Sequence, residues 1–274
     1  MDISSTSTGG GGGAVPTFEK IDEMLAIFGT NKTAFWPFLN STIGSGSFGI
    51  WTYGEELTKT WLVARDQSAN RNLRDEFEPY MHVGGIHSYA ITQGAQTYLS
   101  GQDESNLGFP SNENFSCGAW ILPRDNTDVT IMGKWDNNNQ REWRLILDGN
   151  KKISLQTYDE SNNQSRVSAA DTEMPLSAWQ FVVATTDNND SDLSHTAYLN
   201  AVADGSGNTA SDASFANSPD TSSLFCIGAT LNTAPAVSLV FEGRIALPFV
   251  CGKELSASEV SDLYTISKTL IGLA

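Results

Sequence analysis

Three consecutive stretches near the end of the chain decide its fold: Phe225-Cys226-Ile227-Gly228-Ala229, Phe241-Glu242-Gly243-Arg244-Ile245-Ala246 and Glu254-Leu255-Ser256-Ala257-Ser258-Glu259-Val260-Ser261-Asp262-Leu263-Tyr264. The first two stretches are short and apolar, which favours strands. The third has helical spacing, and Ser256 is a typical N-cap residue at its start. Two strands followed by one short capped helix, in a chain otherwise rich in strands, indicate a β-sandwich that closes with a helix after its last strand.

The chain before this ending also favours short strands separated by turns. Asp148-Gly149-Asn150 predicts a hairpin turn between two of the strands. The polar residues 204–222 predict a long loop. Many short strands and few helices favour an antiparallel two-sheet sandwich. The predicted strands are 33–38, 57–63, 88–91, 97–99, 115–122, 129–135, 143–147, 153–158, 180–185, 195–199, 224–229 and 238–250.

The N-terminal part divides from the rest by composition. Residues 1–13 are mostly Ser, Thr and Gly, which predicts a flexible arm. A helix is expected after Pro16, ending at Gly29 as its C-cap. We therefore expect an arm and docking helix over 1–29, and a sandwich over 30–274 with an insertion at about 50–82. The helix is expected to pack against the sandwich or a neighbouring subunit, with assembly contacts through Phe18, Ile21, Met24 and Leu25.

Charge and cysteine content exclude several classes of function. The chain has 274 residues, with 16 Lys and Arg against 32 Asp and Glu, giving a net charge of −16. Such a charge repels nucleic acid and anionic membrane surfaces. No apolar run reaches the length of a membrane span, so we expect no membrane insertion. Cys117, Cys226 and Cys251 lie in apolar strands and are expected to be buried free thiols, although a Cys117–Cys226 or Cys226–Cys251 bridge stays open.

Six motifs in order resemble the laminin-G-like, concanavalin A-like jelly-roll family. The resemblance covers about Thr33 to Tyr264, with 50–82 poorly matched, and it implies an antiparallel jelly-roll sandwich that ends in a short helix. With the helix expected after Pro16, the expected fold is a jelly-roll sandwich with a short helix at each end. This family includes lectins, glycosidases, adhesion modules and virion proteins, so the resemblance does not decide the function. The motifs are Phe115–Pro123, Ile131–Trp135, Trp143–Tyr158, Trp179–Ala184, Ala197–Ala201 and the C-terminal stretches above; Ala201 replaces the usual glycine of its motif.

Catalysis is not predicted, and no catalytic residue is assigned. A glycosidase needs two carboxylates across one bond, and its strands on this fold often carry alternating acids. The sequence has no Glu-x-Asp-x-Glu pattern or similar alternation; Asp171 and Glu173 lie in a turn. The three histidines, His82, His87 and His195, are scattered and are expected to be structural.

Binding residues are expected in two places. Trp51, Tyr53 and Trp61 lie in the irregular insertion with Arg71 and Arg74 nearby, and they could contact a sugar face or a protein partner. The alternative is that these aromatic residues cap the core. Asp187, Asp190 and Asp192 form an acidic cluster of hard oxygen ligands, which makes calcium the one cofactor to consider, while a solvated loop is the alternative.

Two hypotheses follow from these patterns. The first is a non-enzymatic virion structural protein, a phage capsid decoration or tail-associated subunit that docks through its N-terminal arm. Its partners would be other capsid or tail proteins in an oligomeric assembly. The second is a glycan-binding, lectin-like module for host-surface adhesion, with calcium as a possible aid. The expected location is the virion under the first hypothesis and extracellular under the second.

Overall fold

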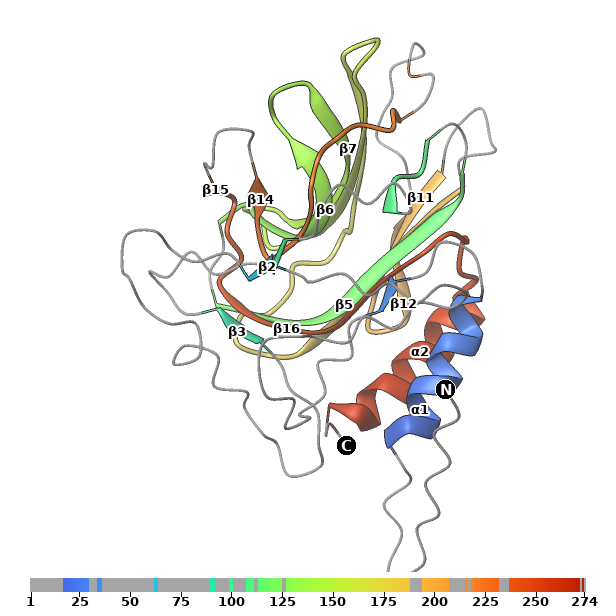
Figure 1. Cartoon of the computed structure of the whole chain (residues 1–274). Helices are drawn as coiled ribbons and strands as arrows, with labels where there is room; N and C mark the ends of the chain where they lie inside the picture. Colours follow the sequence, from blue (N-terminus) through green and yellow to red (C-terminus); the bar gives the residue numbers. More distant parts are fainter. Residues whose placement is uncertain are drawn as a thin grey trace, which may run out of the picture.

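Two antiparallel sheets pack face to face, and two helices cover the outside of one of them (Figure 1). The computed structural model describes residues 17–29, 34–35, 62–63, 89–91, 99–100, 107–110, 113–124, 127–187, 194–206, 215, 218–231, 237–271 and 273. This arrangement confirms the predicted jelly-roll sandwich with a short helix at each end.

The first sheet has the strand order β1-β16-β5-β10-β11-β12, and β3 also pairs with β16. Its central strand β5 alternates in direction: Cys117, Ala119 and Ile121 point toward the other sheet, whereas Trp120 packs toward the helices. The strands are β1 (Ala34–Phe35), β3 (Tyr89–Ile91), β5 (Phe115–Pro123), β10 (Gln180–Asp187), β11 (Ser194–Leu199), β12 (Val202–Ser206) and β16 (Gly243–Cys251).

The second sheet has the order β2-β4-β13-β6-β7-β8-β9, and a separate pair, β14 (Thr230–Leu231) and β15 (Val237–Ser238), lies beside it. The predicted hairpin joins β7 to β8, where the Asp148 carboxylate accepts the backbone N–H groups of Asn150 and Lys152. The strands are β2 (Leu62–Val63), β4 (Leu99–Ser100), β6 (Val129–Asp136), β7 (Gln140–Leu147), β8 (Ile153–Asp159), β9 (Gln164–Ala169) and β13 (Phe225–Ile227).

The core lies in two layers because the first sheet is buried on both faces. One layer fills the space between the sheets, and the other lies between the first sheet and the helices α1 (Thr17–Phe28) and α2 (Ala257–Leu270). Trp120 belongs to this second layer, where its Nε1–H donates to Ser267 Oγ at 2.8 Å. None of the helices among the described residues is long and apolar enough to cross a membrane.

Helix α1 packs on its own chain. Met24, Leu25 and Phe28 are buried in the helix-side layer of the core, and Phe28 stacks on Phe249 with ring centroids 4.6 Å apart. Gly29 ends the helix with φ of 77°, as its predicted C-cap role requires. Of the two expected roles of this helix, the structure therefore shows packing against the sandwich.

Several expectations about single elements have clear outcomes. Cys117, Cys226 and Cys251 are buried free thiols, as expected, and burial raises the pKa of Cys251 to about 12. Three of the described strands were not predicted: β9, β14, and β12, which occupies the start of the expected loop 204–222. The expected strand 238–250 is divided into β15 and β16, and Leu239, in the break between them, has a φ of 49°. Gly243, the first residue of β16, has a φ of 143°, and an added Cβ there would lie 2.1 Å from Leu122 O. The arm, residues 1–13, lies outside the described residues.

Candidate binding face on the second sheet

The outer face of the second sheet differs from that of the first, since neither α1 nor α2 packs on it (Figure 1). An irregularity in the pairing of β6 with β7 decides which side chains reach this face. Lys134 pairs with Trp143, but Trp135 pairs with Arg141, so Glu142 is an extra residue in β7. Trp143 consequently packs in the core between the sheets, while Trp135 contacts residues of the outer face.

Two arginines stack on two aromatic rings on this face. The Arg144 guanidinium carbon lies 4.1 Å from the centroid of the Trp135 ring, and that of Arg141 lies 3.6 Å from the Tyr158 ring. The two rings meet edge to face at 5.7 Å. Gln156, in β8, accepts a hydrogen bond from Arg144 Nε at 2.7 Å. We call Trp135, Arg141, Arg144, Gln156 and Tyr158 the arginine face.

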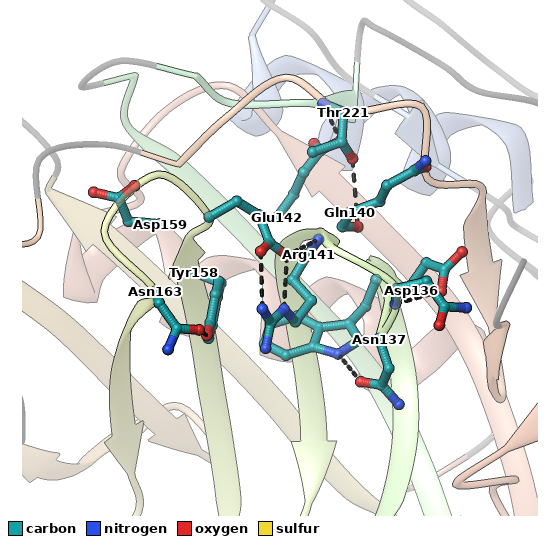
Figure 2. A network of polar contacts seen from close by, with 12 residues as sticks. Asp136, Asn137, Gln140, Arg141, Glu142, Tyr158, Asp159, Asn163 and Thr221 are labelled. Atoms are coloured by element: carbon teal, nitrogen blue, oxygen red, sulfur yellow. Dashed lines mark hydrogen bonds and ion pairs between the residues drawn. The ribbon is translucent and has the colours of Figure 1, made fainter.

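The turn between β6 and β7 borders the arginine face. Asp136 begins it by accepting the backbone N–H of Asn138 at 2.9 Å, and Asn139 ends it in the left-handed region with φ of 65°. The Asn137 side-chain oxygen accepts the Trp135 indole N–H at 2.8 Å, which links the turn to this ring (Figure 2). Asn137, Asn138 and Asn139 are exposed. Aspartate and asparagine suit such a turn because they bond their own backbone and tolerate positive φ.

The turn between β8 and β9 repeats this construction beside the first one. Asp159 accepts hydrogen bonds from Ser161 and from both the backbone and side-chain nitrogen atoms of Asn162. Asn163 has φ of 54°, and its side-chain oxygen accepts the Tyr158 hydroxyl (Figure 2). Ser161, Asn162 and Asn163 are exposed. Both turns therefore present amide groups from one end of the sheet.

Arg141 and Glu160 join the two turns. Arg141 donates from Nε to Glu160 Oε1 at 2.6 Å, from Nη2 to Oε2 at 2.8 Å and from its backbone N–H to Oε1 at 2.8 Å. Burial alone would raise the pKa of Glu160, but these hydrogen bonds from Arg141 outweigh it and hold the pKa below its ordinary value. A two-pronged contact of this kind fixes orientation as well as distance.

A buried acid ties a third segment to the same end of the sheet. Glu142 Oε1 lies 3.1 Å from Lys134 Nζ, with both side chains fully buried. The same oxygen accepts the Thr221 backbone N–H at 2.9 Å and its hydroxyl at 2.7 Å, while Ser222 bonds Gln140 nearby. Burial raises the pKa of Glu142 despite the neighbouring lysine. Figure 2 shows Thr221 next to Gln140 at this end of the sheet.

Of the predicted site residues, the structure describes the side chains of Met24, Leu25 and Asp187, and none of these three belongs to the arginine face. Met24 and Leu25 are covered by this chain itself, so these two side chains are not available to a neighbouring subunit. Asp187 is half-buried at the end of β10. The remaining candidates stay predictions, because they, or in α1 their side chains, lie outside the described residues: Trp51, Tyr53, Trp61, Arg71, Arg74, Phe18, Ile21, Asp190 and Asp192.

Sequence reasoning missed the arginine face. Trp135 looks like an ordinary strand residue, and the pairing irregularity that turns it outward has no signature in the sequence. One signal was present, however. Asp136-Asn137-Asn138-Asn139-Gln140 and Asp159-Glu160-Ser161-Asn162-Asn163-Gln164 are two similar turns one hairpin apart, which antiparallel pairing brings to the same end of the sheet.

Two antiparallel sheets packed face to face, with helices on the outside of one, define the concanavalin A-like jelly-roll class of β-sandwich. A family model described as the concanavalin A-like lectin/glucanases superfamily matches residues 92–261, more than half of the chain. The chain therefore belongs to this superfamily, as its motifs predicted.

Solved structures show the same fold at low sequence identity. The botulinum neurotoxin serotype D binding domain has a TM-score of 0.55 and 13% identity, over 86% of this chain and 52% of that one. The binding domain of Paraclostridial Mosquitocidal Protein 1 has a TM-score of 0.54 and 14% identity, over 84% and 52%. This chain thus spans about half the length of these two structures. The search of curated proteins gave no match.

Proposed function

We propose that this protein is a non-enzymatic, lectin-like module that binds glycans at the arginine face and its two bordering turns. The observation that carries the proposal is the pair of asparagine-rich turns joined by the Arg141–Glu160 ion pair. Sugar hydroxyls both donate and accept hydrogen bonds, and each asparagine side chain offers two donors and an acceptor. Several such amides at one end of a sheet match a ligand that has many hydroxyl groups.

The turns are also arranged to lose little freedom on binding. Asp136 and Asp159 each accept backbone N–H groups of their own turn. Arg141, in the strand that follows the β6–β7 turn, holds the β8–β9 turn through Glu160. Ordering flexible groups at an interface opposes binding, so groups that are already held bind more tightly. The likeness to two toxin domains that are named binding domains supports a binding role for this fold as well.

A glycan array with the whole chain tests this proposal. We expect selective binding, and we expect the double variant Asn138→Ala/Asn162→Ala to bind about tenfold more weakly, since it removes two amides that are each able to form hydrogen bonds. Asn150→Ala is the matched control, because Asn150 is an exposed asparagine in the turn at the opposite end of the same sheet. A silent array, or an equal loss in the control, would contradict the proposal.

The virion role expected from the N-terminal arm stays a prediction. Residues 1–13 lie outside the described residues, and the similar structures above are toxin binding domains rather than capsid or tail proteins. The location, virion or extracellular, is likewise still a prediction, as is calcium binding by Asp187, Asp190 and Asp192. None of these is needed for binding at the arginine face.

A further inference from the structure

Arg144 differs from Arg141, the other charged residue of the arginine face, because no described carboxylate forms a close ion pair with it; Asp128 acts on its charge only from a longer distance. Arg141 is paired with Glu160, and the fully buried Lys134, next to Trp135 in β6, is paired with Glu142. No described carboxylate lies within 4.0 Å of the Arg144 guanidinium, although the chain has 32 acidic and only 16 basic residues. A half-buried, unpaired positive charge in so acidic a protein calls for a physical reason.

The neighbours of Arg144 hold it in one orientation. Its Nε donates to Gln156 Oε1, and its plane lies over the Trp135 ring. Gly133 is the residue opposite Arg144 in β6, and a Cβ there would lie 2.7 Å from the Arg144 Cβ. Glycine thus leaves the space in which the arginine stem lies. Stacking and one hydrogen bond together fix a guanidinium that no ion pair holds.

This orientation leaves one edge of the guanidinium unused. Gln156 occupies Nε, and no described residue accepts a hydrogen bond from the two terminal Nη atoms. These atoms form a fork of parallel donors that matches a planar carboxylate. Desolvation lowers the pKa of Arg144 to about 10, so the group is still charged at neutral pH. Loss of water also strengthens any contact made with an anion.

We propose that Arg144 is the anchor for a carboxylate, and that the glycans bound here are acidic ones that carry a sialic or uronic acid. This inference rests on the proposed function and names its ligand class. A single carboxylate needs one guanidinium fork, and Arg144 offers one. A densely sulfated chain would instead meet the net charge of −16 of the whole protein, which opposes polyanions.

The test compares matched ligands by calorimetry on the whole protein. The probes are oligosaccharides that end in sialic or glucuronic acid, their neutral parents and their sulfated counterparts. We expect the acidic sugars to bind best, and Arg144→Gln to weaken only their binding, by about 10- to 100-fold, as for a charge-assisted hydrogen-bonded pair. Arg144→Lys should restore part of the loss, because it keeps the charge without the fork.

Arg124→Gln is the matched control, since it makes the same change of net charge at an exposed position just after β5. Esterified sialic or glucuronic acid ligands give a second test on the unchanged protein, in case Arg144→Gln does not fold. The inference is overturned if the esters bind as well as the acids, if neutral or sulfated sugars bind equally well or better, or if the control loses as much affinity. Binding of neutral sugars alone would leave the proposed function intact, whereas silence of every probe would overturn both.

Discussion

At the scale of single residues, Glu160 shows how one side chain can set the spacing of two turns. Its two oxygens hold the guanidinium and the backbone of Arg141, so the β8–β9 turn is attached to the first residues of β7. The contact is local, yet it fixes groups from two hairpins relative to each other. Its contribution to stability depends on pH, because it requires an ionised carboxylate.

The Glu160→Gln variant tests this contact. The folded-state pKa of Glu160 lies below its ordinary value of 4.5, so its stabilising effect is present above that value and is lost as the pH falls through the folded-state pKa. We expect Glu160→Gln to lower the free energy of unfolding at pH 7 by about 1 kcal/mol or less. We also expect its stability to fall less steeply than that of the wild type from about pH 5 to pH 3. Urea unfolding across this range measures both.

Glu242→Gln provides the control for that series, because it removes the same formal charge from a residue just before β16. From about pH 5 to pH 3, the free energy of unfolding of this control should fall as steeply as that of the wild type. If the free energy of unfolding of Glu160→Gln falls just as steeply with pH, the Arg141–Glu160 ion pair does not hold the two turns together.

At the scale of elements, α2 is held at its start by a complete capping box. Ser256 Oγ accepts the Glu259 backbone N–H, and Glu259 Oε2 accepts the Ser256 backbone N–H at 2.9 Å. Lys253 then contacts Glu259 and also donates to the Ile27 carbonyl at the end of α1. One short segment therefore fixes the start of one helix and the end of the other.

Ser256→Ala should lower the free energy of unfolding by about 1 kcal/mol, because it leaves the backbone N–H of the first turn without its acceptor. Ser258→Ala, two residues further on and exposed, is the matched control. It should be neutral or slightly stabilising, since alanine favours a helix more than serine does. Thermal and urea unfolding of both variants provide the measurement, and equal losses would contradict the capping role.

The elements also show which parts of the fold could be predicted. Ser256 and the apolar spacing after it predicted the start of α2, which continues beyond Tyr264 to Leu270, and Gly29 marked the end of α1. The strands β9 and β12 could not be found, because each lies at a sheet edge and is held largely by backbone pairing. The arginine face depends on one extra residue in β7, and strand register is a tertiary property that periodicity does not record.

At the scale of the whole molecule, the core layer between the first sheet and the helices packs α1 and α2, near the two ends of the described chain, against the sandwich. Phe28 is fully buried there and contacts both Phe249 and Phe35. Helix α1 therefore belongs to the folded unit. A deletion through residue 29 would expose this apolar layer, so it would not test an assembly role of the arm alone.

Phe28→Ala should lower the free energy of unfolding by about 3–5 kcal/mol, as expected for a large buried aromatic side chain. Val202→Ala, at a residue of β12 that is 69% exposed, should change it by less than about 0.5 kcal/mol. Calorimetric unfolding of the two variants compares them directly. A small loss for Phe28→Ala would mean that α1 is dispensable for the fold.

The placement of α1 and α2 has a consequence for how many copies of this protein could act together. Both helices lie on the first sheet, across the sandwich from β6 and β7, as Figure 1 shows. A linker joined at either helix would therefore leave the arginine face pointing away from whatever carries it. Under the proposed glycan-binding function, several copies attached to one scaffold could then engage one sugar-coated surface at once, and modest individual affinities would combine into strong avidity.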